Sequence, residues 1–184
     1  MKKRVLAGLM MAAMVLASAM SVSAASKEKP VEDGGSANGK YKVTTESPEF
    51  EELTDEAIDA NSKITDKAAA KASAKEASAK IEKINKGETV SISTEVDKDI
   101  KDKKLVQKFF DLDEIDDHRK CHEQGHHTVT LKVDAMTTSW KNITVVHYST
   151  DRTLWETIKV ADKNVDYAKK TITFDIKDLS PIAI

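Results

Sequence analysis

The sequence predicts a mainly β protein, an antiparallel β-sandwich that is immunoglobulin-like in the broad sense, with a helical segment before it. Two runs in the last third alternate apolar and polar residues, TVTLKV at 128–133 and KTITFDI at 170–176. This period of two is typical of a strand with one buried face, and the β-branched residues of both runs favour strands. No helical pattern separates the runs, so we expect antiparallel pairing.

Further strands are expected around these two runs. The segments NITVVHY at 142–148 and TLWETIKV at 153–160 are joined by a polar stretch short enough to close a hairpin. A short strand fits at 165–167, and two more are expected upstream, at 88–96 and at 105–112. About seven strands are within the range of a sandwich, and we assign this module to residues 88–184, with one modest core.

The segment 48–87 has the pattern of a helix. Ser47, Pro48 and Glu49 form a plausible helix start, and Gly87 provides a stop. Apolar residues recur at spacings of three and four in two stripes: Phe50, Leu53, Ala57, Ala60 and Ile64, then Ala70, Ala74, Ala77, Ile81 and Ile84. Most of the residues between the stripes are Ala, Lys or Ser, which favours helix but offers little to bury. We therefore expect a semi-rigid spacer of one long or two shorter helices, with a stripe too thin for membrane insertion.

The N-terminus has the three parts of a secretory signal peptide. Basic residues at 2–4 precede an apolar run at 5–20, and the small residues Val22 and Ala24 suit the −3 and −1 positions of a cleavage site. We expect residues 1–24 to be removed, leaving a chain that is secreted or associated with the cell wall and does not insert into a membrane. No Cys directly follows the apolar run, which disfavours a lipoprotein.

Charge and cysteine content narrow the class of partner. Removal of residues 1–24 leaves 26 basic against 31 acidic residues, a formal net charge of −5, which disfavours nucleic acid as a partner. Cys121 is the one cysteine, so no intramolecular disulfide can form.

Residues 25–47 are mostly small or polar, and we expect a flexible leader there. Tyr41 and Val43 could add an edge strand, but the pattern does not favour it.

A His/Cys-rich stretch, DDHRKCHEQGHH at 116–127, contains the ligand types that zinc and copper prefer. On a helix, His118 and His122 would share a face with Cys121 beside them, and His126 could complete the set. The spacing matches no standard zinc motif, and an exposed polar loop between two strands is the alternative. The stretch therefore carries a metal-binding hypothesis for His118, Cys121, His122 and His126.

Two further residues have a functional and a packing interpretation. His147 is in phase with Ile143 and Val145, which favours a hydrogen-bonded core histidine over a catalytic one. Trp155 has the opposite parity to Leu154 and Glu156, so it could provide a sugar-stacking platform on an exported module. Ordinary packing under the helix or a loop is the alternative for Trp155.

The strings HYSTDRTLWETI at 147–158 and VDYAKKTITFDIKDLSPIAI at 165–184 resemble a β-sandwich module of secreted and wall-anchored proteins from Gram-positive gut anaerobes. Copies of that module tend to end in a similar Leu-Ser-Pro-Val-Ala-Ile phrase. The resemblance implies a fold and a compartment, without a catalytic motif or a known activity. This sequence ends directly after the phrase, with no sortase signal, which speaks against covalent anchoring.

These observations predict a secreted or cell-surface non-enzymatic module for binding, adhesion or assembly, with a protein or glycan partner at the cell surface. We find no nucleophile elbow, paired-carboxylate motif or complete metal-enzyme signature, so a hydrolase is disfavoured. Two alternatives are kept: a metal-binding extracellular protein that uses the stretch 116–127, and a carbohydrate-binding module that uses Trp155.

Overall fold

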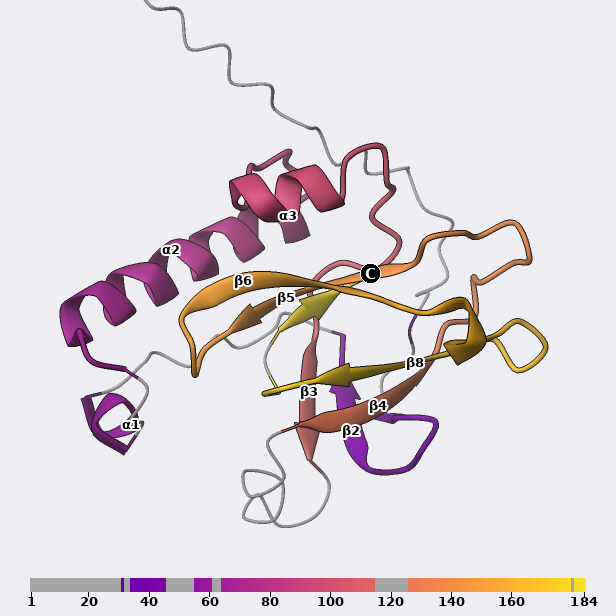
Figure 1. Cartoon of the computed structure of the whole chain (residues 1–184), viewed down its shortest axis with the longest axis horizontal. Helices are drawn as coiled ribbons and strands as arrows, with labels where there is room; N and C mark the ends of the chain where they lie inside the picture. Colours follow the sequence, from indigo (N-terminus) through magenta and orange to yellow (C-terminus); the bar gives the residue numbers. More distant parts are fainter. Residues whose placement is uncertain (1–30, 32–33, 46–54, 61–63, 115–125, 180) are drawn as a thin grey trace, which may run out of the picture.

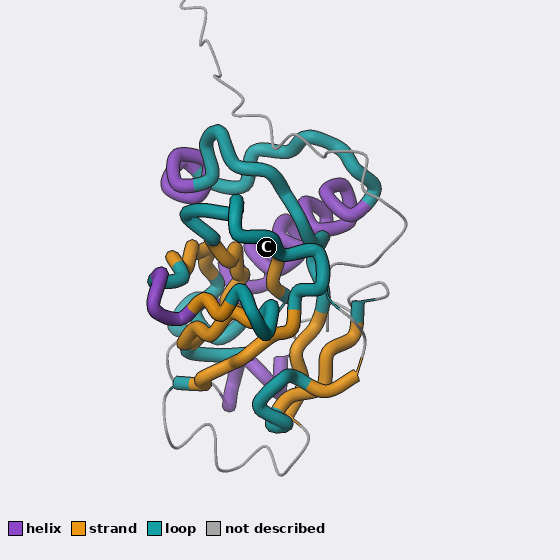
Figure 2. The backbone as a smooth tube through the Cα atoms, turned by 90° about the vertical axis from the view of Figure 1, so that its right-hand side faces the viewer, coloured by secondary structure: helices purple, strands orange, loops and turns teal. Residues whose placement is uncertain are grey.

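A computed structural model describes residues 31, 34–45, 55–60, 64–114, 126–179 and 181–184 (Figures 1 and 2). Its strands form three antiparallel three-stranded sheets, in the orders β1-β2-β3, β4-β8-β7 and β6-β5-β9. The first sheet contains β1 (Gly34–Gly35), β2 (Tyr41–Thr44) and β3 (Asp111–Glu114). The second contains β4 (His127–Lys132), β7 (Val165–Asp166) and β8 (Thr171–Ile176), and the third contains β5 (Thr144–Ser149), β6 (Leu154–Lys159) and β9 (Ile182–Ala183). The helices are α1 (Asp55–Ala60), α2 (Lys67–Asn85), α3 (Thr94–Asp99) and the short 3-10 helix η1 (Asp162–Asn164). The expected mainly β, antiparallel fold is confirmed.

Strand β5 lies at the centre of the molecule, and all six of its residues are buried. It pairs with β6 from Thr144↔Lys159 to Ser149↔Leu154 and with β9 through Val146↔Ala183 and His147↔Ile182. Helices α2 and α3 lie on one side of this sheet and strands β2, β3, β4 and β8 on the other (Figure 1). Two hydrophobic clusters result, where the sequence led us to expect one core.

The larger cluster, called the sheet cluster here, joins β5 and β9 to the other two sheets. Its main members are Tyr41, Val43, Phe110, Leu112, Val129, Leu131, Val145, Ile172, Phe174, Ile176 and Ile182. The smaller one, the helix cluster, joins the same two strands to α2, α3 and the segment after α3. Its members are Ile81, Ile84, Ile92, Val96, Ile100, Leu105, Phe109, Val146 and Ala183.

Helix α2 has the buried face that its sequence predicts: Ala70, Ala74, Ala77, Ile81 and Ile84. The Asp66 side chain accepts a hydrogen bond from Ala69 N at its start, and Gly87, with φ of 86°, follows its end. The helix packs on the sheet, so it is more than a spacer. Asn85 Oδ1 accepts a bond from Phe109 N at 2.9 Å, which ties the end of α2 to the segment before β3.

Three local expectations were wrong. Residues 88–93 form no strand and lead into α3, because the side chains of Asp97 and Ser93 accept bonds from Ile92 N and Val96 N, amides that a sheet would otherwise pair. Regular strand structure begins only at Asp111 rather than at 105, although both phenylalanines before it are buried. The proposed leader contains β1 and β2, since Tyr41 and Val43 bury their side chains in the sheet cluster.

The described part of the helical segment 48–87 comprises two helices, as one alternative predicted, and Ile58 of α1 is fully buried. The proposed helix start at Ser47 and the signal peptide at 1–24 lie outside the described residues.

Candidate functional site

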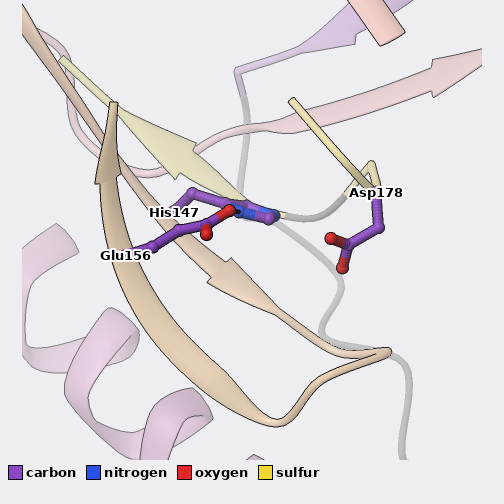
Figure 3. Close-up of side chains that lie close together, drawn as sticks. All are labelled: His147, Glu156 and Asp178. Atoms are coloured by element: carbon purple, nitrogen blue, oxygen red, sulfur yellow. Dashed lines mark hydrogen bonds and ion pairs between the residues drawn. The ribbon is translucent and has the colours of Figure 1, made fainter. Parts of the chain in front are cut away.

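Four side chains form a buried ionic cluster between the β5–β6 hairpin and the segment that follows β8. His147 lies on β5 directly opposite Glu156 on β6, Arg152 lies in the hairpin turn, and Asp178 follows β8. The side chains of His147, Glu156 and Asp178 converge (Figure 3), with one potential ligand atom of each within 4.8 Å of the others. The cluster thus joins residues that are distant in the sequence.

The hydrogen bonds of the cluster satisfy both carboxylates. His147 Nδ1 lies 2.9 Å from Glu156 Oε1. Arg152 donates from Nη1 to Glu156 Oε2 at 2.9 Å and from Nη2 to Glu156 Oε1 at 2.6 Å. The same Nη2 donates to Asp178 Oδ1 at 3.0 Å, and Ser149 Oγ donates to Asp178 Oδ2 at 2.6 Å. Each of the four carboxylate oxygens therefore has a donor.

The hairpin turn holds Arg152 in place. Ser149 pairs with Leu154, which leaves a loop of residues 150–153, and Ser149 Oγ also accepts a bond from Arg152 N at 3.1 Å. Thr153 has a φ of 50°, a backbone conformation that a β-branched residue rarely adopts. Its carbonyl oxygen accepts a bond from Ser73 Oγ of α2 at 3.1 Å. Contacts with α2 and with Ser149 therefore stabilise a strained turn that directs the guanidinium toward the two carboxylates.

Burial and charge make these bonds strong. The side chain of His147 is fully buried, and those of Arg152 and Glu156 are 20% and 25% exposed. The hydrogen bond with His147, and then those with Arg152, lower the pKa of Glu156 to about 2 despite its partial burial. The bonds with Glu156, and next those with Asp178, raise the pKa of the Arg152 guanidinium, so Arg152 stays charged.

The cluster contains ligand types for a metal ion, but its own cation lies between the carboxylates. Arg152 Nη2 contacts one oxygen of Glu156 and one of Asp178, the position that a bridging cation would take. A metal ion there would have to displace the guanidinium or lie beside it, at a high electrostatic cost. His147 Nε2 is buried and has no hydrogen-bond partner among the described residues. As described, the cluster is a hydrogen-bonded ionic network that ties the hairpin to the chain before β9.

The sequence had singled out other residues. His118, Cys121 and His122 lie outside the described residues, and His126 is exposed directly before β4. The metal hypothesis for this stretch stays a prediction. His147 is buried and hydrogen-bonded, as its phase with Val145 indicates. The sequence analysis missed Arg152, Glu156 and Asp178. The spacing of Arg152 and Glu156 around a turn is a weak signal, and Asp178 has no local signal in the sequence.

Trp155 packs against the helix cluster and is half-buried. Its ring meets those of Tyr148 and Phe109 edge-on, with centroid distances of 5.1 Å and 5.7 Å. The Tyr148 hydroxyl lies 3.0 Å from Ser73 Oγ of α2, so the three rings form part of the contact between helix and sheet. Whether Trp155 also binds sugar stays a prediction.

Within the described ranges, no helix combines the length and apolar character needed to cross a membrane. Comparisons with protein-family models, with curated proteins and with solved structures found no match.

Proposed function

We propose that this chain is a secreted or cell-surface module without enzymatic activity, which binds a protein or glycan partner in adhesion or assembly. Its sheets would form the immunoglobulin-like sandwich that the sequence predicts. One observation carries the non-enzymatic part of the proposal: the buried ionic cluster uses all four carboxylate oxygens of Glu156 and Asp178 in internal bonds. A general acid or base needs a carboxyl group that can reach a substrate proton, and a carboxylate with both oxygens in internal bonds does not offer one.

The proposal of export rests on the basic residues, apolar run and small residues of segment 1–24. The sequence resemblance to modules of Gram-positive surface proteins supports the same compartment. The cluster suits such a setting, because in the absence of an intramolecular disulfide it provides a cross-link between hairpin and C-terminal segment by charge and hydrogen bonds.

Two measurements test this function. Fractionation of producing cells followed by N-terminal mapping should place the chain outside the cytoplasm, beginning at Ala25 or within a residue or two of it. Fluorescently labelled mature protein should then bind intact cells saturably, and the heat-unfolded protein, as control, should not. Loss of binding after protease treatment of the cells indicates a protein partner, and loss after periodate treatment a glycan. Retention of residues 1–24 in a cytoplasmic chain, or binding that does not saturate, would overturn the proposal.

A further inference from the structure

Strand β6 presents an edge with which no described strand pairs. The bond from Val160 N to Ile143 O, at 3.0 Å, extends the β5–β6 ladder. It thereby fixes which residues of β6 form backbone hydrogen bonds with β5 and which do not. Residues 154, 156 and 158 therefore direct their N–H and C=O groups toward β5, and the backbone groups of Trp155, Thr157 and Lys159 point away from it. No described residue makes a backbone hydrogen bond with that outer edge.

The outer edges of β9 and β4 are covered by other parts of the chain. Beside β9, Phe110 exchanges two backbone bonds of 3.0 Å with Ile182. Beside β4, Ala37 N donates to Thr130 O at 2.7 Å, and Asn38 Nδ2 donates to Thr128 O at 2.9 Å. Proteins commonly cover, shorten or charge their edge strands, because an open edge pairs with other chains. Among the described strands, β6 is the longest whose outer edge is open.

The sequence of β6 is complementary to itself in one antiparallel register. Trp155, Thr157 and Lys159 are the three residues whose backbone groups point away from β5. If two copies pair about a two-fold axis at Thr157, each of these residues lies opposite one of the same three residues in the second copy. Thr157 then lies opposite Thr157 of the second copy, and Trp155 lies opposite Lys159. Each opposed pair can exchange two N–H···O bonds. The register places no like charges directly opposite each other. It also brings the Lys159 ammonium, which pairs with Asp99 at 3.1 Å within its own chain, to the strand position opposite an indole ring.

The same register covers an exposed apolar side chain. Leu154, at the start of β6, is the most exposed large hydrophobic residue of the described part, with 40% of its surface accessible. In the paired arrangement it lies opposite Val160 of the second copy. The backbone bonds, the cross-strand pairs and this apolar contact all arise from a single register.

We propose that two copies of this chain associate through their β6 edges, antiparallel and centred on Thr157, to form one continuous sheet. The interface is small, so the association is weak and concentration-dependent. This association would explain how the chain takes part in assembly, as the proposed function states. It is inferred from the geometry of β6 alone. A monomeric result would end it and leave export and surface binding to their own tests.

The test is sedimentation equilibrium of the mature chain from about 10 µM to about 1 mM, the range expected for a small transient interface. We expect the apparent mass to rise from one chain to two. Thr157→Pro removes the central outward N–H, which an edge strand can lose without breaking its inner ladder, and should remain at one chain mass throughout. Thr157→Val is the matched control: it loses the hydroxyl bond to Asp99 but keeps the N–H, and should associate like the wild type.

Amide exchange of the wild type provides a readout that does not depend on the folding of a variant. Protection of the amides of Trp155, Thr157 and Lys159 should increase with protein concentration, whereas those of Glu156 and Ile158 should be protected at every concentration. Any of three results would overturn the proposal. The wild type could keep the mass of one chain over the whole range, or a folded Thr157→Pro variant could associate like the wild type. The third is protection of the outer-edge amides that does not change with protein concentration.

Discussion

Val145 and Val146 are adjacent on β5, but their side chains lie in hydrophobic clusters on opposite sides of the sheet. Ile182 and Ala183 of β9 divide between the two clusters in the same way, as do Phe110 and Phe109. Successive side chains of a strand point to opposite faces, so a strand in a sheet with both faces covered buries side chains of both parities. The central sheet is therefore packed against the helices on one face and against the other strands on the opposite face.

The first prediction concerns the contact between α2 and the sheet. Ile84 is 1% exposed and lies in the helix cluster. Ile84→Ala should lower the free energy of unfolding by about 3 kcal/mol, because it removes buried methyl groups and leaves a cavity. Lys83→Ala, an exposed neighbour on the same turn, is the control and should change it by less than about 0.5 kcal/mol. Urea denaturation measures both; equal effects would mean that α2 does not pack on the sheet in solution.

The sequence analysis predicted the strands with strict alternation and the buried stripe of α2, because in both cases one face is apolar and the period is clear. It did not predict that α2 packs on β5. The run TVVHYS of β5 has apolar residues on mixed faces, which indicates burial on both sides, but the sequence does not say which element covers each side. Most of the stripe of α2 is alanine, and its two isoleucines, Ile81 and Ile84, are the residues of the stripe that enter the helix cluster.

The second prediction concerns the cation of the buried ionic cluster. Arg152→Met keeps much of the side-chain volume but leaves the carboxylates of Glu156 and Asp178 without their shared donor. We expect a loss of about 2 kcal/mol of stability, less than for a fully buried pair because Arg152 is 20% exposed. Lys75→Met on the exposed face of α2 is the control. A variant as stable as the wild type would show that the network contributes nothing.

The third prediction is a pH dependence. The pKa of Glu156 is about 2 in the folded chain, below its ordinary value of 4.5, so between these values the unfolded chain binds a proton that the folded chain does not. The stabilisation is therefore complete above about pH 4.5 and declines as the pH falls toward 2. After a discount for partial exposure we expect about 2 kcal/mol.

Melting curves of the wild type and Glu156→Gln at pH 6 and at pH 3 measure this effect. The variant lacks the titrating carboxyl group, so the difference in stability between the two proteins should be large at pH 6 and smaller at pH 3. A difference that is the same at both pH values would show that the carboxylate of Glu156 does not contribute through its charge.

Little of the buried ionic cluster could be predicted. The phase of His147 with Val145 indicated burial, and the hairpin between β5 and β6 was expected from its polar turn. Asp178 enters the site only because the chain after β8 returns to β5 and places β9 beside it. The periodicity of the sequence does not predict that the chain comes back beside β5, because this depends on the order of strands in the sheet and not on a local pattern.

The fourth prediction separates packing from sugar binding at Trp155. Because its ring contacts Tyr148 and Phe109, Trp155→Ala should cost about 2–3 kcal/mol of stability. Glycan-array binding of the same variant, at a temperature where it is folded, should equal that of the wild type. Trp140→Ala, a partly buried tryptophan beside the sheet cluster, is the control. An unchanged melt together with lost glycan retention would instead favour the platform.

The last prediction tests metal binding, for which the chain offers two candidate sets. If the stretch 116–127 binds zinc, His118→Ala combined with His122→Ala should abolish the zinc-dependent rise in melting temperature, and His147→Gln should leave that rise intact. If the buried ionic cluster binds zinc, the result is reversed. We expect no zinc effect from the cluster, because the Arg152 guanidinium already lies between its carboxylates. Imidazole and thiolate ligands must lose their protons, so binding through 116–127 should weaken as the pH falls below the range in which histidines titrate. Zinc content after purification without an affinity tag is the direct measurement, and equal sub-stoichiometric metal in all three proteins would end both metal hypotheses.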